Sequence, residues 1–103
     1  MTLNELYTIL TSTGLPVAYS HFPEKQSLPF VTYVVAYSSN FKADNKVMQK
    51  IENIQVELYT AKKDLVTEEL LETALRENSI PWEVVEAFLE EENCFQRIYE
   101  ITI

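Results

Sequence analysis

The chain has 103 residues, of which 47% are hydrophobic, and carries a formal net charge of −8. This length and apolar content argue against disorder and predict one domain that spans residues 1–103. The sequence has neither the apolar run of about 20 residues that a membrane span needs nor a signal-peptide pattern, so we expect no membrane partner and synthesis in the cytoplasm.

The first predicted element is a helix over residues 3–13. Thr2 and Glu5 have the spacing of a capping box at its start. The apolar positions that follow form one helical stripe: Leu3, Leu6, Tyr7 and Leu10. Gly14, the only glycine, stands where a helix ends in a left-handed conformation, and Pro16 prevents its continuation.

Three predicted strands follow this helix. The first covers residues 17–22 and ends at Pro23, which cannot donate to a ladder. The second covers residues 30–37 and is apolar on both faces, which is typical of a central strand or of one that lies against a partner subunit. The third covers residues 48–59, and its period of two makes it the expected centre of the sheet.

The second predicted helix covers residues 65–78, with Asp64 as its N-cap. Its expected buried stripe comprises Val66, Leu70, Leu71, Ala74 and Leu75. Strands over residues 82–89 and 95–103 form a terminal hairpin. The order α-β-β-β-α-β-β predicts an α+β fold of two layers, an antiparallel sheet with both helices packed on one face.

A polar loop is expected over residues 38–46, and it contains the first candidate contact residues. Phe41, flanked by Lys42 and Lys46, suits docking onto an acidic partner. The alternative is that Phe41 packs back over the edge of the sheet and belongs to the core.

The charges divide the chain into two unlike halves. Residues 1–63 carry six lysines and five acidic residues, a net charge of +1, whereas residues 64–103 carry two arginines and eleven acidic residues, a net charge of −9. The acidic half argues against binding to duplex phosphates. It is either a surface that keeps the domain soluble or one side of a protein–protein contact, for which Glu90, Glu91 and Glu92 are further candidates.

Groups that could carry catalysis are scarce. His21 is the only histidine, and in the strand expected there its side chain would point away from that of Ser20. Cys94 is the only cysteine, and the preceding glutamates disfavour a thiolate. Glu90–Glu92 lack the ligand spacing of a calcium loop. We therefore predict a protein without enzymatic activity and without catalytic, cofactor or metal sites.

Several segments together resemble a known family. They are Pro29 to Tyr33, Ile54 to Asp64 and the acidic turn before the last strand. With the N-terminal helix, they are similar to the small tail-completion proteins of siphophages and prophages of Gram-positive bacteria, which include tail terminators and head–tail joining proteins. The resemblance covers nearly the whole chain and is most specific over Ile54 to Asp64.

The resemblance implies a structural role in the virion, at the interface between head and tail. Such proteins form rings, commonly hexameric, that cap the tail tube, contact the head connector and surround the DNA channel without reading its sequence. The expected partners are therefore further copies of the chain, the tail-tube protein and the head connector. Two alternatives remain open, an acidic inhibitor or antitoxin-like module that covers a basic cleft and a small enzyme with a polar pocket.

Overall fold

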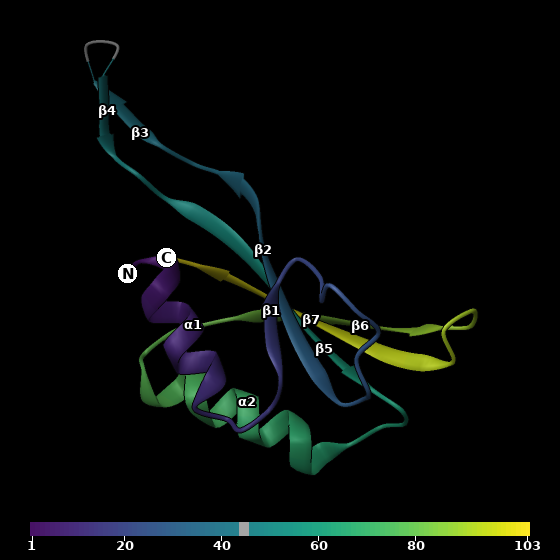
Figure 1. Cartoon of the computed structure of the whole chain (residues 1–103). Coiled ribbons are helices and arrows are strands. Elements are labelled where there is room, and N and C mark those ends of the chain that lie inside the picture. Colours follow the sequence, from purple (N-terminus) through teal and green to yellow (C-terminus); the bar gives the residue numbers. More distant parts are fainter. Residues whose placement is uncertain (44–45) are drawn as a thin grey trace.

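The computed structural model describes the backbone of residues 1–43 and 46–103, and the side chains outside residues 41–49. Figure 1 shows the order of the elements: α1 (Leu3–Thr11), β1 (Val17–Tyr19), β2 (Phe30–Ser38), β3 (Phe41–Ala43), β4 (Lys46–Gln49), β5 (Glu52–Thr60), α2 (Leu65–Glu77), β6 (Glu83–Leu89) and β7 (Cys94–Thr102). The predicted α+β fold is confirmed, and so is the predicted order of its helices and main strands.

Five strands form the main sheet in the order β1-β2-β5-β7-β6, with β5 at its centre as predicted. The pairs β2–β5, β5–β7 and β6–β7 are antiparallel, but β1 runs parallel to β2. The sheet is therefore mixed, and the prediction of a purely antiparallel sheet is wrong at this edge. Ser20, with a φ of 66°, ends β1 after three residues, and the connection through residue 29 returns the chain to the start of β2.

The core lies between the sheet and both helices, which pack on one face. Alternate residues of β5 point into it, as the period of two predicts, and Ile54, Val56 and Leu58 are each at most 1% exposed. The helices and β7 contribute its other fully buried side chains, Leu6, Leu10, Leu71, Leu75 and Tyr99.

The second apolar face of β2 is covered in part by the connection that precedes the strand. The Phe22 ring packs edge-on against the Phe30 ring, with 5.3 Å between the ring centres. The Phe30 ring stacks on Tyr59, with 4.8 Å between the ring centres. Strand β2 lies inside the sheet, between β1 and β5, which agrees with the first of the two predicted alternatives, whereas a contact with a partner subunit stays a prediction. Its two apolar faces arise because helices cover one face and a loop covers part of the other.

Both helices begin at the predicted caps. The Thr2 hydroxyl accepts a hydrogen bond from the Glu5 N–H at 3.1 Å, and the Glu5 carboxylate accepts one from the Thr2 N–H at 3.2 Å. Helix α1 ends two residues earlier than predicted, and the hydroxyls of Ser12 and Thr13 donate to carbonyls of its last turn. Gly14 then has the predicted left-handed conformation, with a φ of 85°.

The segment expected as a polar loop is mostly a strand ladder. Strand β2 extends to Ser38, and β3 pairs with β4 in an antiparallel ladder that we call the arm. Bulges between Val35 and Tyr37 and between Phe41 and Lys42 break the regular pairing, and such irregularities bend strands. Figure 1 shows the arm extending away from the body, and the longest dimension of the molecule is 49 Å.

Candidate interaction surface

Helix α2 presents large apolar side chains to solvent. Leu65, Val66 and Leu70 are 69%, 76% and 45% exposed. The prediction that Val66 and Leu70 pack on the sheet is wrong. Successive residues of a helix are rotated by about 100° around its axis, so Leu70 and Leu71 point in different directions. Leu71 and Leu75 face the sheet and are fully buried, whereas Val66 and Leu70 face solvent.

These exposed residues line a groove between α2 and the end of α1, which we call the α2 groove. It has a volume of about 590 Å³. Ser12 and Thr13 form its α1 side, and apolar side chains of α2 line most of the remainder. Glu69 and Glu77 add negative charge to it. The groove is therefore mainly apolar, with carboxylates among its lining residues.

The start of α2 is held by Asp64. One of its carboxylate oxygens accepts from the Thr67 N–H at 3.1 Å, and the other accepts from the Thr67 hydroxyl at 2.6 Å. Both hydrogen bonds lower the pKa of the Asp64 carboxyl, and the one from the Thr67 hydroxyl has the larger effect. The predicted N-cap is confirmed, and it sets where the exposed apolar residues of the first turn lie.

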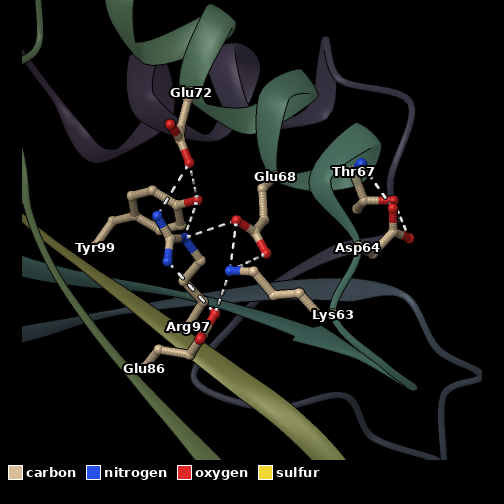
Figure 2. A network of polar contacts seen from close by, with 8 residues as sticks. All are labelled: Lys63, Asp64, Thr67, Glu68, Glu72, Glu86, Arg97 and Tyr99. Atoms are coloured by element: carbon tan, nitrogen blue, oxygen red, sulfur yellow. Dashed lines mark hydrogen bonds and ion pairs between the residues drawn. The ribbon is translucent and has the colours of Figure 1, made fainter.

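A polar network fixes α2 against the β6–β7 hairpin, as Figure 2 shows. Arg97 extends from β7 toward the helix, where its guanidinium lies 3.4 Å from Glu68 and 3.4 Å from Glu72. The same guanidinium lies 3.4 Å from Glu86 of β6. One arginine therefore connects the helix to two neighbouring strands.

Lys63 and Tyr99 complete this network. The Lys63 ammonium is 2.9 Å from both Glu68 and Glu86, and these hydrogen bonds, led by the one to Glu86, raise the pKa of Lys63. The Tyr99 hydroxyl donates to Glu72 at 2.7 Å, and burial followed by this hydrogen bond raises the pKa of Tyr99. Each charged group in the network contacts at least one opposite charge, an arrangement that holds the helix in place.

Sequence reasoning did not identify this network, although two signals for it exist. Glu68 and Glu72 are four residues apart, a spacing that places two like charges on one side of a helix and favours a cation between them. Arg97 stands in a strand that is otherwise largely apolar. Neither signal indicates that the two segments meet, because 25 residues separate Glu72 from Arg97.

Strand β6 is the second exposed apolar feature. Among the strands that the structure describes, it lies at an edge of the sheet and pairs with β7. Val84, Val85 and Phe88 are 40%, 56% and 46% exposed. A seven-residue edge strand with exposed apolar side chains is a possible template for pairing with another chain.

The predicted contact residues lie at opposite ends of the molecule. Phe41 and Lys42 belong to β3 and Lys46 to β4, but their side chains fall outside the described residues, so the two interpretations of Phe41 both stand. Glu90, Glu91 and Glu92 are exposed in the turn between β6 and β7. Figure 1 shows this turn on the other side of the body from the arm, so one chain does not bring the two groups together.

The expectation that the Ser20 and His21 side chains point away from each other is wrong. Because β1 ends at Tyr19, Ser20 and His21 do not alternate as in a strand, and the Ser20 hydroxyl lies 3.2 Å from the His21 Nδ1. Both residues are exposed. Cys94 is buried, and burial together with the charge of Glu92 raises the pKa of its thiol, in the predicted direction.

No protein-family profile matches the chain, and no curated protein matches it. Within the residues that the structure describes, no set of three or more histidine, cysteine or acidic side chains is arranged to hold a metal ion. No helix in this part of the chain is long and apolar enough to cross a membrane.

Proposed function

We propose that the chain is a non-enzymatic structural protein of a phage virion, a tail terminator or head–tail joining protein. In this proposal, copies of the chain form a ring that caps the tail tube and contacts the head connector. The proposal rests on the family resemblance of Pro29–Tyr33 and Ile54–Asp64 and on the surfaces described above.

The observation that carries this proposal is the position of two unlike features on one small domain. The arm extends from one end of the molecule, and α2 lies away from it (Figure 1). The side chains of α2 line most of the apolar α2 groove. A ring is built by a head-to-tail contact, in which two different patches of the same chain meet. Exposed apolar side chains such as Val66 are also more typical of interaction sites when they are grouped than when they are scattered.

The uneven charge supports the same proposal. The acidic half, with a net charge of −9, includes α2, β6 and β7, whereas the arm and its flanks belong to the half that contains all six lysines. Unlike charges at opposite ends favour association between copies in one orientation. A negatively charged surface that lines a channel would also repel passing DNA.

The second candidate function is an acidic inhibitor or antitoxin-like module. The exposed turn with Glu90, Glu91 and Glu92 favours it, because three adjacent carboxylates can pair with the basic residues of a nuclease cleft. This function needs only one acidic surface, and it leaves the exposed apolar residues of α2 without a role.

Electron microscopy and light scattering test the proposal. The purified chain is mixed with the tail-tube protein encoded in the same genome region, and tube length is measured. We expect closed rings at the tube ends and shorter tubes. A chain that stays monomeric, binds neither tube nor connector and instead inhibits a neighbouring nuclease would support the second candidate.

A further inference from the structure

We propose that the α2 groove is the docking site for the arm of a second copy of this chain. This inference rests on the proposed ring and identifies the two surfaces that meet in it.

The groove matches a ligand that is apolar and carries positive charge. Val66 and Leu70 offer apolar surface that the described residues of the monomer leave exposed. Glu69 and Glu77 lie in the same groove and bring two negative charges, of which Glu69 contacts Arg76 at 3.3 Å. Both acids are solvent-exposed, so they give orientation and partner choice more than affinity.

The arm has this composition. Its strands contain three large apolar residues, Phe41, Val47 and Met48. Residues 41–50 carry three lysines against one aspartate, a net charge of +2. The arm therefore combines apolar side chains with positive charge over a short segment, which complements the groove.

A chain cannot place its own arm in its own groove. Figure 1 shows the arm extending from one end of the sheet and α2 on the side of the body away from the arm. The contact must therefore form between copies. Because arm and groove are different patches, each copy offers one to the preceding neighbour and the other to the next, and such a contact closes into a ring when its rotation permits.

The first experiment changes the apolar surface of the groove. Val66→Asp adds a charge at a side chain that is 76% exposed, so folding should be preserved, and circular dichroism and thermal unfolding check this. Thr8→Asp is the matched control, since it adds the same charge at an exposed position of α1 outside the groove. Sedimentation velocity at low salt should show self-association at least about tenfold weaker for Val66→Asp and unchanged for Thr8→Asp.

The second experiment exchanges the charges of the two surfaces. Variant one carries Lys42→Glu and Lys46→Glu in the arm, and variant two carries Glu69→Lys and Glu77→Lys in the groove. Each variant alone brings like charges together and should associate at least about tenfold more weakly than the wild-type chain. An equimolar mixture restores opposite charges at every contact, so assembly should return.

The results separate this inference from the proposed function. If the wild-type chain forms rings and Val66→Asp forms them equally well, the arm-and-groove contact is wrong but the proposed ring stands. The same conclusion follows if the wild-type chain forms rings and the mixture of the two charge variants does not assemble. A wild-type chain that stays monomeric at about 1 mM and does not bind the tail tube would overturn both.

Discussion

Replacement of Arg97 by methionine tests whether the network under α2 holds the helix to the sheet. The substitution keeps an unbranched apolar chain of similar length but removes the guanidinium. Glu68 is 6% exposed, and in the variant it keeps its ion pair with Lys63. Glu72 loses its ion pair with Arg97 and keeps the hydrogen bond from Tyr99.

The expected cost follows from the burial of these groups. Removing one partner of a buried ion pair typically costs about 3–5 kcal/mol, because the other charge stays buried without compensation. Arg97 itself is 19% exposed and Lys63 still contacts two of the three carboxylates, so we expect the lower end, about 3 kcal/mol. The exposed pair between Arg76 and Glu69 provides the comparison, since its two side chains are 57% and 61% exposed and such pairs contribute about 0–1 kcal/mol.

Urea unfolding followed by circular dichroism measures both effects at pH 7. Arg97→Met should lower the free energy of unfolding by about 3 kcal/mol and Arg76→Met by less than about 1 kcal/mol. Adding Glu68→Gln to Arg97→Met should recover part of the loss, because it removes a buried carboxylate that has lost the nearby charge of Arg97. Equal losses of unfolding free energy for the two arginine variants would refute the proposal that the network holds α2 to the sheet.

Three further predictions concern the core, the arm and pH. Leu71→Ala should cost about 2–5 kcal/mol in urea unfolding, because the Leu71 side chain is fully buried. Leu70→Ala should cost less than about 1 kcal/mol, because the Leu70 side chain is 45% exposed. Similar costs for the two variants would contradict the orientation of α2. Phe41→Ala should leave the thermal midpoint unchanged and weaken assembly by more than about 1 kcal/mol in sedimentation, whereas lost stability with unchanged assembly would place Phe41 in the core. The pKa values of Asp64 and Glu86 are lowered in the folded chain, so their stabilisation is present above their ordinary values of 3.8 and 4.5 and is lost as the pH falls through the lowered values. Acid titration of the urea midpoint should show this loss, and a Glu86→Gln variant that keeps the full wild-type pH dependence would argue against the Glu86 contribution.

Local signals in the sequence predicted the elements that local interactions determine. The capping box at Thr2 and Glu5 and the Asp64 cap involve residues within one helical turn, so their spacing is sufficient to locate both helix starts. The period of two over Ile54 to Leu58 likewise identified the central strand, because alternate residues of β5 face a core on one side only.

The features that depend on distant segments were not predictable in this way. The direction of β1 depends on the path of the connection through residue 29, which a composition pattern does not define. The extension of β2 into the arm occurs in a polar segment whose residues are typical of loops. The Arg97 network requires α2 and the terminal hairpin to meet, and the exposure of Val66 depends on which face of α2 then turns toward the sheet.

Ring formation is tested most directly by the molar mass of the wild-type chain in solution, measured by light scattering at low salt and at increasing protein concentration. If copies of the chain form the proposed ring, the mass rises from the 12.0 kDa of the monomer to a fixed multiple, and it falls again when Val66→Asp is introduced. A mass that remains at the monomer value at every concentration, with and without the tail-tube protein, would contradict ring formation.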